Sequence, residues 1–296
     1  MSVAADTYGV MGFGVDAFDP GSVIVKSVSS YISAVLADNP LVFWEMQETS
    51  GTTAADSSPN GNAGTYSGPS APTLAQPGPL VGSTSVQFAN GYVSSTNNQY
   101  VISTNLFDPA GRLSAGDTGH ISLECWLLIA SGPPAGSSGF ASILGMVNQN
   151  NAGANTPDMY VRWDGFGVAY AYPYVSGAQF SVGATQLFDG EWHHLVLVAT
   201  DSGYMIYIDG RQDSPLTSLS GVLYNSFTGG STLKFAVGPW IAGGSYGVTG
   251  YIAFAAMYQS ALSASRIATH FLSAPVLPSV GKIGQWDVDL YAKAWF

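Results

Sequence analysis

The sequence predicts an all-β protein that folds as a β-sandwich. Short runs rich in β-branched and aromatic residues, such as 142–147 and 195–198, are separated by Gly, Pro, Asn and Asp turn signals. Residues 204–208 alternate, with Tyr, Ile and Ile on one face and Met and Tyr on the other. Hydrophobic residues make up 46% of the 296 residues, enough for a large core, whereas charged residues make up only 9%. These observations together favour one large sandwich domain covered by neutral polar loops.

The N-terminal half is expected to begin with a helix and continue with strands. Residues 30–37 can form a short helix that ends before Asn39-Pro40. Residues 67–82 are rich in Pro and Gly and are expected to be a loop. Ala89-Asn90-Gly91 is a hairpin signature between 86–88 and 92–94.

The second half contains the clearest strand pairs. A strand is expected at 121–127, and residues 159–163 and 166–172 should pair across Asp164-Gly165. Residues 192–198 and 204–208 should form a hairpin, with Trp192 and Ile206 buried on facing strands, followed by a tight turn at Asp209-Gly210. Further strands are expected at 232–237 and 250–258, and Ser263 can cap a helix that runs to Leu272.

Several of these segments carry motifs of a known family. Residues 189–198 read DGEWHHLVLV and residues 204–210 read YMIYIDG, while 34–66, 250–258 and 261–267 fit the expected entry strand, closing strand and short helix. This pattern resembles the LamG-like jelly roll of the concanavalin A-like lectin and glucanase superfamily, as found in bacteriophage minor tail and other virion proteins. The resemblance spans roughly residues 30–274 and implies a jelly-roll β-sandwich. It leaves the ligand open, because such a fold hosts enzymes, lectins and inert spacers.

Composition excludes several functions. The net charge is −11 with no basic stripe, so we expect no nucleic-acid binding. No run approaches the roughly 20 apolar residues of a membrane span, so membrane insertion is not expected. The single cysteine, Cys125, is expected to act as a small buried hydrophobe. No apolar stretch near the N-terminus fits a signal peptide. We therefore expect a protein made in the host cytoplasm that reaches the outside in a virion.

The residues needed for catalysis are not found in a usable pattern. Glucan-cleaving relatives carry alternating acids, Glu-x-Asp-x-Glu, whereas here Glu45 and Glu48 are three apart and Glu124 stands alone. His193 and His194 should point to opposite faces of their strand and cannot chelate one ion together. No Gly-x-Ser-x-Gly elbow is present. The chain is therefore predicted not to be an enzyme.

Two kinds of ligand site remain candidates. Asp56, Asn60 and Asn62 offer hard oxygen ligands for calcium, although the same residues can instead satisfy the backbone of Asx turns, and no cofactor is required. Aromatic rings in and beside the long loops can stack on sugars, although they can equally serve as core and rim packing. The candidate carbohydrate-binding residues are Tyr160, Trp163, Asp164, Tyr172, Tyr174, Trp240 and Tyr246.

Aromatic residues also occur in both terminal segments. We expect three parts: an N-terminal docking segment (1–29), the jelly-roll domain (30–274) and a C-terminal aromatic docking segment (275–296). The alternative is that both segments fold back onto their own sandwich. The candidate interface residues are Phe13, Phe18, Trp286, Tyr291, Trp295 and Phe296.

The function that these expectations favour is a bacteriophage virion protein, a minor tail or tail-fibre-associated component. Its partners would be other virion subunits, further copies of itself and host-surface glycans. One alternative is a capsid or head decoration protein without sugar binding. Another is a secreted glycan-binding or glucan-hydrolase-like protein.

Overall fold

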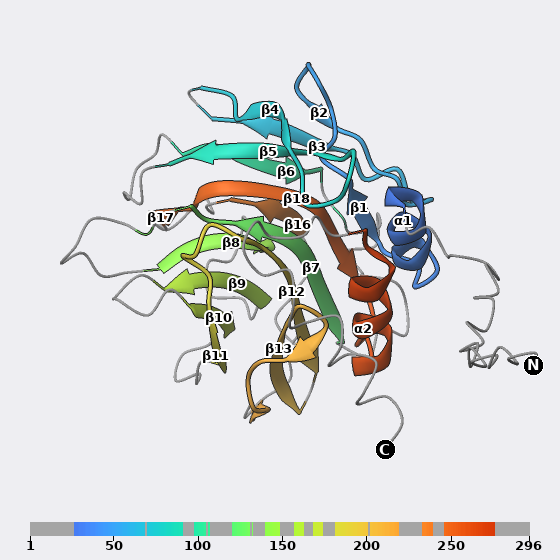
Figure 1. Cartoon of the computed structure of the whole chain (residues 1–296), viewed down its shortest axis with the longest axis vertical. Coiled ribbons are helices and arrows are strands. Elements are labelled where there is room, and N and C mark those ends of the chain that lie inside the picture. The colour runs from blue at the N-terminus through green and yellow to red at the C-terminus, as the bar shows by residue number, and fades with distance from the viewer. Residues whose placement is uncertain are drawn as a thin grey trace, which may run out of the picture.

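The computed structural model describes most of the sandwich that the sequence predicts (Figure 1). The described residues are 27–68, 70–90, 98–104, 106, 120–130, 132, 140–148, 157–162, 168–173, 181–200, 202–218, 233–238 and 246–275. They form an all-β jelly-roll sandwich of two sheets with two short helices. Neither helix in these ranges has the length and apolarity that a membrane crossing requires.

The first sheet, sheet A, has the order β14-β13-β12-β7-β18-β5-β4, with β1 paired to β18 and β15 to β13. All of its pairings are antiparallel. Its strands are β1 (Val42–Trp44), β4 (Thr73–Pro77), β5 (Thr84–Ala89), β7 (Ile121–Leu128), β12 (Trp192–Thr200), β13 (Gly203–Ile208), β14 (Arg211–Gln212), β15 (Thr217–Ser218) and β18 (Thr249–Tyr258).

The second sheet, sheet B, has the order β11-β10-β9-β8-β16-β6-β3-β2, and β17 pairs with β8 in parallel. Its strands are β2 (Thr53–Ala54), β3 (Gly64–Ser67), β6 (Tyr100–Ser103), β8 (Phe140–Asn148), β9 (Pro157–Arg162), β10 (Val168–Pro173), β11 (Ser181–Gln186), β16 (Leu233–Val237) and β17 (Tyr246–Gly247).

The main hydrophobic core lies between the two sheets. Alternate residues of strands such as β7, β12 and β18 enter it, as the period of a strand requires. Cys125 of β7, Leu195 of β12 and Ile252 of β18 are fully buried there, opposite residues such as Phe235 of sheet B. The prediction that Cys125 is a buried hydrophobe is confirmed.

A second core covers the outer face of sheet A. Helices α1 (Val28–Leu36) and α2 (Ala264–Ser273) lie side by side over this face (Figure 1). Ser27 caps α1 in a reciprocal capping box with Ser30, and Ser263 caps α2, which confirms the cap expected from the sequence. Tyr31 of α1 and Ile267 of α2 are fully buried against the sheet. Both faces of sheet A are therefore buried where the helices lie.

The β12–β13 hairpin is confirmed, but one detail of its packing was predicted wrongly. Asp209 and Gly210 have φ of 51° and 75° and make the expected two-residue turn into β14. Ile206 is buried in the core between the sheets, opposite Leu197. Trp192, by contrast, lies on the outer face, is only half-buried and pairs with Leu128 of β7. The error arose because parity along β12 puts Trp192 with His194 and Val196, not with the inward-facing residues.

Two other local expectations need correction. The segment 67–82 contains β4, which pairs with β5, so it is not only a loop. Residues 86–88 belong to β5, which pairs with β4 and β18. The Asn90 side chain bonds the backbone of Gln99 and Val248, and residues 92–94 lie outside the described ranges.

The expected terminal docking segments lie almost entirely outside the described residues. This holds for Phe13, Phe18, Trp286, Tyr291, Trp295 and Phe296, so their role as interface residues stays a prediction. The division into three parts at residues 29 and 274 also stays a prediction.

Candidate functional site: an aromatic sheet face and a sealed acid–histidine network

Three of the seven predicted carbohydrate-binding residues lie in described strands. Tyr160 is in β9, Tyr172 in β10 and Tyr246 in β17. Trp163, Asp164, Tyr174 and Trp240 lie outside the described residues.

By strand register, positions 160 and 172 belong to the same face of sheet B. Met159 and Val161 flank Tyr160 along β9 and are both fully buried in the core, so Tyr160 occupies the outer face, where it is half-buried. Tyr160 is the register partner of Ser142 and of Tyr170, which in turn pairs with Val182. This row therefore crosses four neighbouring strands on the outer face.

A second row lies beside it. Tyr172 pairs with Asp158, which pairs with Gly145, and Gly145 pairs with Ala236 of β16. Two tyrosine rows and one aspartate position thus lie next to small residues at the middle of the sheet. Tyr246 is not part of this arrangement, because its register partner is the core residue Ala141. We call positions 158, 160, 170 and 172 the tyrosine face.

The residues predicted to hold calcium form a tightly bonded loop. Asp56 Oδ1 accepts hydrogen bonds from the backbone N–H of Phe43 (2.9 Å) and Ser58 (3.0 Å). Asp56 Oδ2 accepts from the Ser58 hydroxyl (2.7 Å) and the Asn62 N–H (2.6 Å). The Asn60 and Asn62 side chains both donate to the Leu41 carbonyl. The arrangement closes the loop onto β1 as Asx turns do, and calcium binding there stays a prediction.

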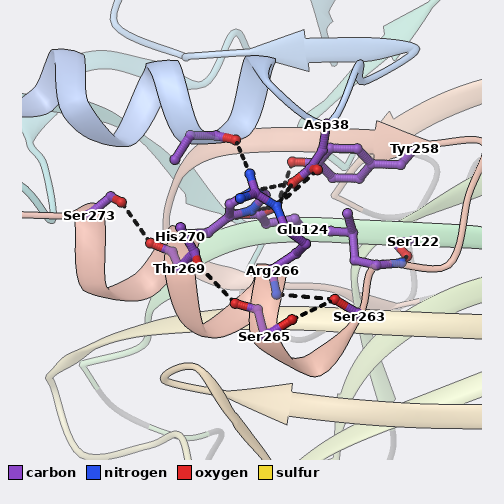
Figure 2. A network of polar contacts seen from close by, with 12 residues as sticks. Asp38, Ser122, Glu124, Tyr258, Ser263, Ser265, Arg266, Thr269, His270 and Ser273 are labelled. Atoms are coloured by element: carbon purple, nitrogen blue, oxygen red, sulfur yellow. Dashed lines mark hydrogen bonds and ion pairs between the residues drawn. The ribbon is translucent and has the colours of Figure 1, made fainter.

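A network of ionisable side chains that the sequence did not reveal lies between sheet A and the two helices (Figure 2). Its centre is Glu124 of β7, which is fully buried. His194 Nε2 of β12 lies 2.7 Å from Glu124 Oε1, and His270 Nδ1 of α2 lies 3.0 Å from Oε2. The hydroxyls of Tyr31 and Tyr258 donate to the same carboxylate at 2.9 and 2.7 Å. Every lone-pair direction of Glu124 is thus used by a donor from a different element.

The network continues outward through Asp38, just after α1. Asp38 Oδ2 lies 2.8 Å from His270 Nε2, and it also accepts from Arg266 Nε at 2.9 Å. Arg266 in addition donates to the Ala34 carbonyl of α1 at 3.2 Å. Figure 2 shows the carboxylate, imidazole and guanidinium groups converging between the helices and the sheet.

The charges in this network shift each other's pKa. Burial alone would raise the pKa of Glu124, but the positive charge of His270 and hydrogen bonds from His194 and His270 outweigh it and lower the pKa well below its usual range. Burial would lower the pKa of His270, but Glu124 and Asp38 outweigh it and raise the pKa. Both directions favour a carboxylate paired with an imidazolium. Burial and the Glu124 charge raise the pKa of Tyr31 and Tyr258, which stay as neutral donors.

This network has the residue types of an active site but not its access. Glu124, His194 and His270 all have zero solvent exposure. A general acid or nucleophile must reach the substrate, and these groups are covered by α1 and α2. The arrangement can therefore hold the helices on the sheet, whereas it cannot contact a sugar in this conformation.

His193 lies on the other face of β12 from His194, as predicted. Its Nδ1 is 2.9 Å from Asp209 Oδ2, and its Nε2 is 3.3 Å from Asp189. Burial would lower the pKa of His193, but the hydrogen bond and charge of Asp209, together with Asp189, raise it. Asp209 Oδ1 also accepts from the His194 N–H at 2.9 Å, so the cluster fixes the turn after β13 to the start of β12. No group of three or more His, Cys, Asp or Glu in the described ranges is arranged to hold a metal ion.

Comparison with solved structures supports the fold. A Trypanosoma rangeli sialidase in complex with 2,3-difluorosialic acid aligns over 79% of this chain at 16% identity with a TM-score of 0.52. The binding domain of botulinum neurotoxin DC in complex with rat synaptotagmin II aligns over 80% of the chain at 12% identity with a TM-score of 0.51. This chain covers only 33% of the sialidase chain and 52% of the neurotoxin chain. Identities this low show the fold alone.

The sequence itself matches no curated protein, but it does match a family model. The model is Laminin_G_3, described as the concanavalin A-like lectin/glucanases superfamily, and it covers residues 82–268, more than half of the chain. The matched range includes the β12–β13 hairpin, the Glu124 strand and the first half of α2. The chain therefore belongs to the concanavalin A-like lectin/glucanases superfamily, whose fold serves both glycan binding and glycoside hydrolysis.

Proposed function

We propose that this chain is a non-catalytic glycan-binding protein of a bacteriophage particle, a minor tail or tail-fibre-associated component that contacts host-surface sugars. The observation that carries the sugar-binding part is the tyrosine face. Tyr160 and Tyr172, two predicted sugar-binding residues from separate strands, occupy adjacent rows on one outer face of sheet B. Tyrosine positions that share a register with an aspartate position, 158, suit a sugar by residue type, because a sugar offers C–H faces and hydroxyl donors.

The non-catalytic part rests on where the carboxylates lie. Hydrolysis needs two carboxyl groups that flank a glycosidic bond, roughly 5–10 Å apart. Glu124, the strand glutamate of sheet A, is sealed beneath the helices. Glu45 and Glu48 accept hydrogen bonds from neighbouring side chains. The Glu45 carboxylate accepts from Gln47 and Ser57, and the Glu48 carboxylate accepts from the Tyr66 hydroxyl. The tyrosine face itself has one acidic position, Asp158.

The virion part rests on the sequence. A charged fraction of 9% gives a surface of neutral polar loops, and aromatic-rich segments flank the sandwich on both sides. Such segments suit anchoring to neighbouring subunits, because aromatic side chains bury much area for little entropy. Many copies on one particle would turn weak sugar contacts into firm attachment, with a gain in avidity of about 10²–10⁴.

A glycan array with the purified chain tests sugar binding, with Tyr160→Ala as the test variant and Leu216→Ala, a change at an exposed position just before β15 of sheet A, as the control. We expect binding that Tyr160→Ala weakens and Leu216→Ala leaves unchanged, with both variants folded. Release of reducing ends from β-glucans, abolished by Glu45→Gln or Glu124→Gln, would overturn the non-catalytic assignment.

Localisation in the particle needs its own experiment. Gold-labelled antibody against the chain, imaged on intact particles, should mark the tail. Label on the capsid, together with an empty glycan array, would instead support a head decoration protein.

A further inference from the structure

A second row of aromatic and polar residues crosses sheet A at the end that the helices leave uncovered. Register pairs Trp192 of β12 with Leu128 of β7, Leu128 with Tyr251 of β18, and Tyr251 with Gln87 of β5. Partners in register lie on one face. All four side chains are half-buried.

This row lies directly beside the sealed part of the same face. The next outward-facing row along these strands contains His194, Trp126 and Ala253, which have zero exposure. Phe271 of α2 stacks on Trp126 with ring centroids 5.9 Å apart, which covers that row. The half-buried row thus begins where the cover of α2 stops. The half-buried row is therefore a narrow strip beside fully buried side chains of the same sheet face.

The side chains of the row are held in a defined arrangement. The rings of Trp192 and Tyr251 meet edge to face, with centroids 6.4 Å apart and planes at 61°. Gln87 Nε2 donates to the Tyr251 hydroxyl at 3.2 Å, so that hydroxyl keeps its own proton available for a ligand. Among the described residues, none accepts a hydrogen bond from the Trp192 indole N–H. The row therefore offers ring faces together with two unused neutral donors.

The charge, size and hydrogen-bonding groups of the row indicate which class of ligand it can bind. It contains no charged side chain, and a chain with a net charge of −11 repels anions over its surface. A stable protein partner buries roughly 800 Å² on each side, far more than four half-buried side chains can give. Ring faces combined with neutral donors suit a small ligand that has both C–H faces and hydroxyls.

We infer that Trp192, Tyr251 and Gln87 form a second binding site, for a neutral sugar ring, on the outer face of sheet A. The inference rests on the proposed function, because it assigns a further site to the same activity. Since the two sheets pack face to face, their outer faces point away from each other. The tyrosine face and this site would then bind two separate glycan chains.

The test is a glycan array followed by titration of the strongest neutral oligosaccharide, with the full chain and four variants. Trp192→Leu and Tyr251→Leu remove the rings, Gln87→Ala loosens the Tyr251 hydroxyl, and Leu216→Ala is the surface control. We expect each ring variant to lose affinity by about tenfold at one of two sites, a loss that one aromatic contact can cause. Gln87→Ala is the mildest change, and it should lose less glycan affinity than the ring variants. It keeps the test valid if a ring variant fails to fold.

The outcomes separate this inference from the proposed function. Neutral-glycan binding that weakens in Tyr160→Ala but is unchanged in Trp192→Leu, Tyr251→Leu and Gln87→Ala would overturn the second site alone. Binding of acidic glycans only would also overturn it and leave the tyrosine face in place. No binding to any glycan would overturn both. Quenching of tryptophan fluorescence by the sugar that disappears in Trp192→Phe would support the second site directly.

Discussion

Glu124 of β7 and His270 of α2 are 146 positions apart in the chain, yet His270 Nδ1 lies 3.0 Å from Glu124 Oε2 in a site with no solvent exposure. One carboxylate thereby connects the central strand of sheet A to the last described helix. Tyr31 of α1 donates a hydrogen bond to the same carboxylate, which connects α1 to it as well. One buried carboxylate thus contacts both helices at once, in addition to the apolar residues that pack them on the sheet.

Replacing Glu124 by Gln should destabilise the protein strongly. The change keeps size but removes the charge, which leaves His270 as a buried cation with only Asp38 to balance it. Breaking a buried pair in this way costs about 3–5 kcal/mol in the free energy of unfolding. Urea unfolding at pH 6 measures it, with Glu191→Gln as the matched control, because the Glu191 side chain makes no hydrogen bond or ion pair with any described residue. Equal stability of the two variants would contradict the central role of Glu124.

Stability should depend on pH on both sides of a plateau. The pKa of His270 is raised from 6.5 in the folded protein, so its contribution is complete below pH 6.5 and is lost as the pH rises through the folded pKa. The pKa of Glu124 is lowered from 4.5, so its contribution is complete above pH 4.5 and is lost as the pH falls through the folded pKa. The melting temperature should therefore be highest between about pH 4.5 and 6.5.

His270→Gln tests the alkaline side of this profile. It should flatten the fall in melting temperature above pH 6.5, because the group whose proton is lost is no longer present. His193, whose pKa is also raised, contributes with the same sign, so His193→Gln should remove a separate part of the slope. A slope in His270→Gln identical to that of the unaltered chain would show that the buried pair does not titrate with folding.

The two tryptophans of the sheet A outer face should differ in their importance for folding. Trp126 has zero exposure beneath α2, so Trp126→Ala should cost about 3–5 kcal/mol. Trp192 is half-buried at the uncovered end, so Trp192→Ala should cost less than half as much. Thermal unfolding of both variants measures the difference. A larger loss in Trp192→Ala would mean that its row is part of the packed core.

Substitution of Asp56 distinguishes whether its loop binds calcium or acts only as a turn. Its carboxylate accepts four hydrogen bonds from the chain, so Asp56→Ala should cost about 1–3 kcal/mol even in the presence of a chelator. If the loop acts only as a turn, the melting temperature of the unaltered chain should be the same in EDTA and in millimolar calcium. A rise in calcium that Asp56→Ala abolishes would instead establish the metal site.

Much of the sandwich could be predicted from the sequence, because the signals for its strands, turns and helix caps are local. Alternation in 204–208, Asp209-Gly210 at the turn and Ser263 at the helix start each act within a few residues, and the structure has all three. Trp192 shows the limit of this reasoning. Local pattern identified its strand, but which face is covered depends on helices far away in the chain.

The Glu124 network could not be assembled from the sequence for the same reason. Its members come from five separate elements or their ends, and only the register of β7, β12 and β18 together with the packing of two helices brings them together. One signal was present: a lone glutamate in an apolar strand of a chain with few charges needs a buried partner. Tyr160 and Tyr172 were predicted as sugar-binding residues, but their common face follows only from the β9–β10 register.

The bond between Asp38 and Arg266 has a mechanical consequence. It joins the residue two positions after α1 to the first turn of α2, so it lies at the ends of the two helices that are farthest from Ser27 and Ala274. A pull on Ser27 and Ala274 would load the opposite ends of the helices first, and it would reach this ion pair only after straining the contacts of Tyr31 and His270 with Glu124. The helices should therefore leave sheet A in steps under force, with the Glu124 contacts breaking before the Asp38–Arg266 pair.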